Sequence, residues 1–326
     1  MNAAMNYGVG LAIILTSGML YDRWRVKDAH QKQIDDYDII KKYLLTESTL
    51  AKAEKPILWV PLQFEYNSRD WQSFGSRNSY CMNKPYISLC VRSIIERCGD
   101  EFQVCLVDDA AFNKILPGWN VRIQNLPNPL KQHMRYLAMS KLLYSYGGMI
   151  VPPSFICLRS LYSVYSVGLS NMSMFSGELV STSNTSVITT FFPSMKIMGC
   201  EKESEVMGNF VNYLEQAISG DYTNELEFNG GPQRWLYERA MENRILIING
   251  DVFGVKDRKG NQVALESLIG DIDINFDKKM CGIYIPEEML EKRTALNWFE
   301  RLSPKQVLES DTLIGSYLLA SNSGRL

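Results

Sequence analysis

The stretch YLAMSKLLYSYGGMIVPPS, residues 136–154, decides the fold, because one predicted element ends within it and the next begins. Apolar residues at spacings of three and four lead into it and predict a helix over Leu130–Tyr146. The pair Gly147–Gly148 follows, and glycine commonly ends a helix. The apolar run Met149–Val151 then predicts a short strand, which Pro152–Pro153 would stop. A helix that turns directly into an apolar strand is typical of a sheet covered by helices.

The sequence before this stretch alternates in the same way. Ile57–Leu62 and Phe102–Val107 are apolar runs of strand length, and between them Pro85–Cys98 has a helical pattern that Gly99 would close. Alternation of this kind predicts a mainly parallel sheet with helices on its faces. The expected fold class is therefore α/β.

After residue 160 the pattern is less regular. We expect strands at Phe175–Val180, Ser186–Phe192 and Ile245–Ile248, and helices at Glu203–Ser219 and Pro232–Asn243. Residues 257–282 are rich in Gly, Asp and Asn, which indicates loops and a hairpin.

Composition excludes several classes of protein. Hydrophobic residues make up 46% of the 326 residues and charged residues 21%, which are ordinary values for a folded protein. The formal net charge is -2 and no long run of basic residues occurs, so we expect no nucleic-acid partner. The seven cysteines include no CxxC pair and only two histidines accompany them, so we expect buried, reduced thiols and no metal site.

The first 21 residues contain no charged side chain and predict a transmembrane anchor. Two alternatives stay open. A cleaved signal peptide would need basic residues before the apolar run, and a helix in the protein core would be weakened by Gly8 and Gly10. The residues expected in the bilayer include Tyr7, Val9, Leu11, Ile13, Ile14, Leu15 and Leu20.

Charge next to the anchor predicts its orientation. Arg23, Arg25 and Lys27 directly follow the apolar run, and basic flanks stay on the cytoplasmic side. We therefore expect a single-pass membrane protein whose C-terminal domain is cytoplasmic. Residues 22–55 are charged with a narrow apolar stripe and predict a helical stalk. A domain at 56–300 and a helical tail at 301–326 would follow.

Residues 136–154 resemble the signature of DxD-type glycosyltransferases, a family with the GT-A fold that includes membrane-bound mannosyltransferases. Three further segments are similar to other parts of that family: Lys55–Trp59 to its first strand, Phe102–Asp108 to its second, and Asn229–Pro232 to a later Gly-Pro element. The residues that carry the fold in this resemblance are Tyr146, Gly147, Gly148, Gly231 and Pro232.

The resemblance implies a metal site that this chain lacks. In the family, two carboxylates after the strand hold a divalent cation, which binds the diphosphate of a sugar nucleotide. Here the Asp-x-Asp positions are Pro152, Pro153 and Ser154, and the helix Asp and Arg positions are Tyr136 and Met139. We therefore expect a non-catalytic protein with no cofactor, no metal and no small-molecule substrate.

Other charged residues are candidates for a residual cleft. Asp108 and Asp109 follow a predicted strand, but a helix cap before Ala110 is the interpretation that we favour. Arg135, or Lys131, would hold a diphosphate if the chain were a transferase that needs no metal. Asp271-Ile272-Asp273 is interpreted as solvated loop acids. The group Glu65, Arg69 and Asp70 is either a loop ion pair or a binding rim.

The whole chain also resembles a group of virion proteins of large icosahedral double-stranded DNA viruses. The similarity lies in FEYNSRDWQSFGSR, residues 64–77, and in YGGMIVPPSF, residues 146–155. It implies a minor capsid protein that is anchored in the inner membrane and contacts other capsid proteins in the shell above. A metal-independent transferase and a non-catalytic sugar- or nucleotide-binding module are the alternatives.

Overall fold

A computed structural model describes residues 55–62, 84–116, 118–181, 189–220 and 225–322. The predicted anchor at 1–21, nearly all of the stalk at 22–55, and the group Glu65, Arg69 and Asp70 lie outside these residues. Within the described part of the chain, no helix has both the length and the apolar character that crossing a membrane requires.

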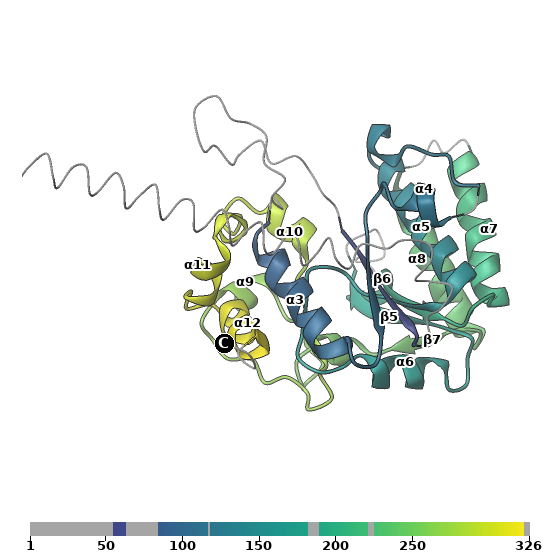
Figure 1. The fold of residues 1–326 in the computed structure, drawn as a ribbon. Helices are drawn as coiled ribbons and strands as arrows, with labels where there is room; N and C mark the ends of the chain where they lie inside the picture. Colours follow the sequence, from purple (N-terminus) through teal and green to yellow (C-terminus); the bar gives the residue numbers. More distant parts are fainter. Residues whose placement is uncertain (1–54, 63–83, 117, 182–188, 221–224, 323–326) are drawn as a thin grey trace, which may run out of the picture. The chain divides into compact units, whose positions relative to one another are not determined.

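A six-stranded sheet forms the centre of the fold, with the order β2-β1-β3-β6-β5-β7 (Figure 1). Three of its five pairings are parallel, namely β1 with β2, β1 with β3 and β5 with β7, whereas β6 runs antiparallel to both of its neighbours. The strands are β1 Ile57–Pro61, β2 Gln103–Val107, β3 Gly148–Ile150, β5 Met174–Val180, β6 Phe191–Cys200 and β7 Leu246–Ile248. The predicted α/β class with a mainly parallel sheet is confirmed at this level.

Helices cover the sheet (Figure 1). The largest group is α4 Phe112–Ile115, α5 Leu130–Tyr146, α7 Glu205–Ser219 and α8 Glu225–Met241, whose apolar side chains form one core with the sheet. Two more helices contact the sheet, α3 Tyr86–Cys98 at β2 and α6 Tyr162–Leu169 at β5, β6 and β7. The predicted bounds of α3 and α5 are confirmed to within one residue.

The Gly147–Gly148 turn joins α5 to the sheet in the way the sequence predicts. Both glycines have a positive φ, +71° and +101°. A Cβ atom on Gly148 would lie 2.2 Å from the carbonyl oxygen of Ile57 on β1, so only glycine fits there. The carbonyl oxygen of Gly147 accepts a hydrogen bond of 2.9 Å from the indole of Trp59, whose side chain is fully buried.

The strand expected at Ser186–Phe192 is misplaced, because β6 runs from Phe191 to Cys200. Its pairing with β5 shifts register, so that Ser176 faces Met198 but Gly177 faces Ser194. Residues 195–197 form a bulge in β6, and Pro193 lies just before it. Proline and a bulge interrupt the alternation by which a strand is recognised in a sequence.

The helix expected at Pro232–Asn243 is also misplaced, because α8 begins at Glu225 and contains Pro232 in its interior. Proline removes a single helical hydrogen bond, and apolar packing holds the helix on both sides of it. The ring of Trp235 lies 5.0 Å from that of Phe210 on α7. A Cβ atom on Gly231 would lie 2.5 Å from the hydroxyl of Tyr213, so the glycine lets α7 and α8 approach.

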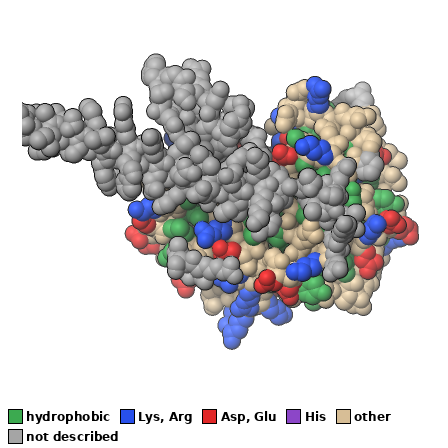
Figure 2. All heavy atoms as spheres, in the orientation of Figure 1, with side chains coloured by type: hydrophobic (Ala, Val, Ile, Leu, Met, Phe, Trp, Pro, Cys, Tyr) green, Lys and Arg blue, Asp and Glu red, His purple; other side chains and the backbone are tan. Residues whose placement is uncertain are grey.

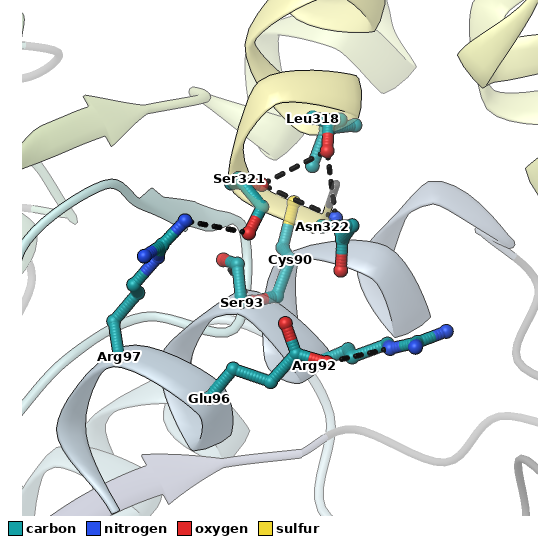
Figure 3. Close-up of polar contacts among 8 residues, drawn as sticks. All are labelled: Cys90, Arg92, Ser93, Glu96, Arg97, Leu318, Ser321 and Asn322. Atoms are coloured by element: carbon teal, nitrogen blue, oxygen red, sulfur yellow. Dashed lines mark hydrogen bonds and ion pairs between the residues drawn. The ribbon is translucent and has the colours of Figure 1, made fainter. Parts of the chain in front are cut away.

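A second sheet pairs β4 Phe155–Cys157 with β8 Gly282–Tyr284 in antiparallel register, and neither strand was predicted. The C-terminal helix α12 packs against α3 and β4, and the side chain of Arg97 donates a hydrogen bond of 3.1 Å to the carbonyl oxygen of Ser321 near its end (Figure 3). The remaining short helices are η1 Ile123–Asn125, η3 Gly250–Phe253, α9 Leu265–Ile269, α10 Glu287–Lys292, η4 Phe299–Arg301, α11 Pro304–Leu308 and α12 Leu313–Asn322.

Candidate functional site

The residues at the Asp-x-Asp positions form a filled corner at the end of β3. Pro152, Pro153 and Ser154 are all buried, and the side chain of Ser154 is fully inaccessible to solvent. The carbonyl oxygen of Pro152 accepts from the amide of Phe155 at 3.2 Å, and that of Ser154 accepts from the amide of Ile285 at 3.1 Å. We call residues 152–154 the motif corner. It carries no charge, and its one side-chain oxygen, Ser154 Oγ, is buried without a hydrogen-bond partner.

The two helix positions of the signature have separate surroundings. Met139 is buried in the core that α5 forms with α7 and the sheet. Tyr136, one turn earlier on α5, is partly buried and lines a pocket of about 150 Å³. Burial raises the pKa of the Tyr136 hydroxyl, so it is a neutral donor and acceptor at neutral pH.

The pocket lies between the main sheet and the small one. Its walls come from the ends of β5 and β6, from α8, from residues 254–268, and from β8 and α10. Apolar and polar side chains share the lining, including Phe192, Leu265, Gln233, Gln262, Lys196 and Tyr284. We call this the Lys196 pocket.

Lys196 reaches the pocket because it lies in the bulge of β6. Its ammonium donates hydrogen bonds of 3.0 Å to the hydroxyl of Tyr284 and 3.0 Å to a carboxylate oxygen of Glu288. Burial alone would lower the pKa of Lys196, but Tyr284 and Glu288 outweigh it and raise that pKa well above its usual value. Burial raises the pKa of Tyr284 to about 12. Glu288 is half-exposed, and although burial would raise the pKa of its carboxyl, the ammonium of Lys196 lowers that pKa from its usual value.

The charges that line the Lys196 pocket are balanced. Glu288 neutralises Lys196, and Arg293 at the rim forms an ion pair with Glu266. Binding of a diphosphate needs unpaired cations or a metal ion, whereas binding of a neutral ligand with several hydroxyl groups needs both hydrogen-bond donors and hydrogen-bond acceptors. The hydroxyls of Tyr136 and Tyr284 and the amides of Gln233 and Gln262 supply such groups.

The candidates for a residual cleft have structural partners. A carboxylate oxygen of Asp108 accepts from the amide of Ala111 at 2.7 Å, in the turn that precedes α4. The N-cap of α4 is Ala111, which makes no side-chain capping bond, so Asp108 holds the turn before the helix rather than the predicted cap position. Both carboxylate oxygens of Asp109 accept from Arg135, at 2.9 and 2.7 Å, in a largely buried pair. The guanidinium of Arg135 is thus engaged with Asp109 rather than directed at an open site.

The remaining sequence candidates lie apart from the pocket. Asp271 and Asp273 are exposed in a loop around Ile272, whose side chain is 74% exposed, so the interpretation as solvated loop acids is confirmed. Lys131 lies in the first turn of α5 and is partly buried. On the face shown in Figure 2, side chains of both charges are interspersed over the described surface.

Sequence reasoning missed the residues that give the pocket its chemistry. Lys196 and Tyr284 are 88 residues apart in the chain, and each lies in a strand that was misplaced or missed. One signal was present, because Lys196 is a single charge in the otherwise uncharged run Phe191–Cys200. A lone lysine in a strand of this kind needs a partner.

A scan against models of known protein families and a search among curated proteins both give no match.

Proposed function

We propose that this chain is a glycosyltransferase-like protein that has lost sugar transfer and has a structural role. The observation that carries the proposal is the motif corner. Where a DxD-type enzyme would present two carboxylates to a cation, this chain has two prolines and a serine, all buried. The filled position supports the loss of metal-assisted departure of a diphosphate, because no carboxylate stands there to bind a cation.

The contrast between fold residues and chemical residues supports the proposal. The Gly147–Gly148 turn keeps a geometry that only glycine allows, with the Cβ position of Gly148 2.2 Å from a backbone oxygen. Met139, by contrast, fills the core, and the cation at Arg135 is paired with Asp109. The sequence thus retains the residues that the turn requires, while the ionic groups of the signature are replaced and the nearby cation Arg135 is paired.

We further propose that the role is that of a membrane-anchored minor capsid protein in a large DNA virus. Residues 1–21 would anchor the chain in the inner membrane, and the basic residues Arg23, Arg25 and Lys27 would keep the folded domain on the cytoplasmic side. That side faces the shell when a virion membrane derives from cytoplasmic membranes. The domain would then contact other capsid proteins and link the membrane to the shell.

Transfer activity is tested with the full chain in detergent micelles, incubated with UDP- and GDP-sugars and Mn²⁺. We expect release of the nucleoside diphosphate at the buffer rate, while an active DxD-type enzyme in the same micelles serves as the positive control. Release above the buffer rate that Lys196→Met lowers would contradict the loss of transfer.

The anchor is tested by flotation with liposomes of the full chain and of a chain that lacks residues 1–21. We expect only the full chain to float with the vesicles, in high salt as well as low salt, because apolar insertion is not screened. Equal flotation of both chains would contradict the anchor.

In purified particles, the capsid role predicts a fixed ratio of this chain to the major shell protein.

One observation favours a second candidate function, the binding of a small ligand without transfer. The Lys196 pocket is open, has donors and acceptors, and includes Tyr136 at a former signature position. This candidate predicts that neutral saccharides raise the Tm of the chain without Mn²⁺, and that Lys196→Met removes the effect.

A further inference from the structure

Two cysteines far apart in the sequence meet in the small sheet region. Cys98 is the last residue of α3 and Cys157 the last of β4, and their Sγ atoms lie 3.6 Å apart. Both side chains are fully buried. A disulfide has an S–S distance of about 2.05 Å, so small rotations of the two side chains would bring the sulfurs into bonding distance.

The two thiols are not equivalent. The two Sγ atoms share a hydrogen bond in which either can be the donor, and the thiol of Cys157 also contacts the carbonyl oxygen of Arg159 at 3.1 Å. The contact with Cys157, together with a hydrogen bond from the backbone of Leu161, lowers the pKa of Cys98 despite its burial. The same contact, together with burial, raises the pKa of Cys157. Among the six cysteines in the described part of the chain, Cys98 alone has a lowered pKa, while burial raises that of Cys105 to about 12. Cys98 is therefore the better nucleophile of the pair.

The surroundings hold the backbones of the pair in place, and exposed residues follow Cys98 directly in the chain. The amide of Cys157 donates to Ser93 Oγ at 2.9 Å, which fixes the end of β4 to α3. Directly after Cys98, residues 99–101 are exposed, and Glu101 accepts a hydrogen bond from Ser160, three residues after Cys157. Opening of this surface bridge would admit a small oxidant without unfolding of the core.

We propose that Cys98 and Cys157 form an oxidation site, at which a small hydroperoxide converts the two thiols into a disulfide that ties α3 to β4. With hydrogen peroxide, the sulfur of Cys98 attacks one peroxide oxygen, the O–O bond breaks, and the hydroxide that leaves takes the Cys98 proton as water; an organic hydroperoxide would release an alcohol in its place. The sulfur of Cys157 then attacks the Cys98 sulfenic acid, the S–S bond forms, and the S–O bond breaks with loss of a second water. Two thiols thus give up two electrons in total, and the peroxide accepts them.

The disulfide would strengthen the region that holds the C-terminal helix. Arg97, next to Cys98, binds the carbonyl oxygen of Ser321 near the end of α12 (Figure 3). Cys157 belongs to β4, which pairs with β8. Oxidation would therefore join α3 covalently to the small sheet, and Arg97 on α3 would hold α12 next to this link. A disulfide that closes a loop of this length is expected to raise the Tm by roughly 7 °C.

The test uses the full chain in detergent micelles, treated with hydrogen peroxide, after which free thiols are alkylated and the peptides are mapped by mass spectrometry. We expect one cross-linked peptide pair that joins Cys98 to Cys157, a raised Tm, and reversal of both by dithiothreitol. Cys98→Ala and Cys157→Ala should each abolish the cross-link and the shift. Cys105→Ala is the matched control, because Cys105 is equally buried and burial alone raises its pKa.

The mapping on the wild-type chain keeps the proposal falsifiable even if a variant fails to fold. Cross-linking of Cys157 to Cys281, the residue before its β8 partner, would overturn the assignment of the pair. Alkylation of both Cys98 and Cys157 after peroxide treatment of folded chain would overturn the oxidation site itself.

Discussion

The motif corner and the Lys196 pocket lie side by side but have opposite characters. Ser154 directly precedes β4, and Phe155, the first residue of β4, pairs with Tyr284 of β8, which lines the pocket. The corner is filled, uncharged and buried, whereas the pocket is hollow and contains an ion pair. The comparison teaches that packing fills the corner, while the neighbouring space is open and its charges are balanced.

The largest expected effect lies at the turn that leads into the corner. Gly148→Ala would place a Cβ atom 2.2 Å from the carbonyl oxygen of Ile57 at a φ of +101°. We expect it to lower the free energy of unfolding by ~4 kcal/mol or more, measured by urea denaturation of the full chain. Gly260→Ala is the control, because Gly260 also has a positive φ but open space around it. It should cost only ~1–2 kcal/mol, and equal costs would mean that the turn is not tightly fixed.

The next effect tests the corner itself. Ser154→Asp would put a carboxylate into a fully buried position without a cation, and we expect a loss of ~3 kcal/mol in the free energy of unfolding. Ser154→Ala should change it by no more than about 0.5 kcal/mol, because the hydroxyl that it removes has no partner. If Mn²⁺ stabilised the Ser154→Asp chain but not wild type, the corner would still be able to hold a metal.

The smallest effect concerns the pocket and depends on pH. Lys196→Met removes the partner of Glu288, and we expect a cost of ~1 kcal/mol near neutral pH, since Glu288 is half-exposed and can regain water. Lys196 lowers the pKa of Glu288 in the folded state relative to the unfolded state. The ion pair therefore stabilises the fold fully at a pH above the unfolded-state pKa of Glu288, and this stabilisation is lost as the pH falls through the folded-state pKa.

Urea denaturation at neutral and acidic pH measures this difference between wild type and Lys196→Met. The difference should shrink in acid, and a difference that grew there would show that Glu288 is not the partner that matters. Lys305→Met is the control, because Lys305 and Glu309 form an ion pair that is largely exposed on both sides. Its effect should be near zero at both pH values.

Local pattern predicted the first half of the fold well. β1, β2 and α5 are encoded by consecutive apolar residues or by helical spacing, and glycines mark the ends of α3 and α5. The second half depends on distant contacts. The bulge in β6 needs its partner β5, α8 continues through Pro232 because Trp235 packs on α7, and β4 and β8 are three-residue strands that exist only as a pair.

The same distinction applies to the site. Tyr146-Gly147-Gly148 fixes the register of residues 152–154 in the sequence, and the pattern also predicts Asp109 and Arg135 as charged candidates, which form an ion pair in the structure. The contact between Lys196 and Glu288, which are 92 residues apart, could not be predicted from the sequence, because it depends on the bulge in β6 and on the placement of α10. The contact between Cys98 and Cys157, which are 59 residues apart, could not be predicted either.

The most direct test of the central claim is a thermal-shift titration of the full chain in detergent micelles, with UDP- and GDP-sugars in the presence and absence of Mn²⁺. A ligand that binds only the folded state at 100 times its Kd would add ~2.7 kcal/mol, which corresponds to a Tm rise of roughly 5 °C or more. The filled motif corner predicts that no sugar nucleotide changes the Tm, with or without Mn²⁺. A saturable rise that requires Mn²⁺ would contradict the claim that this chain has lost the metal site.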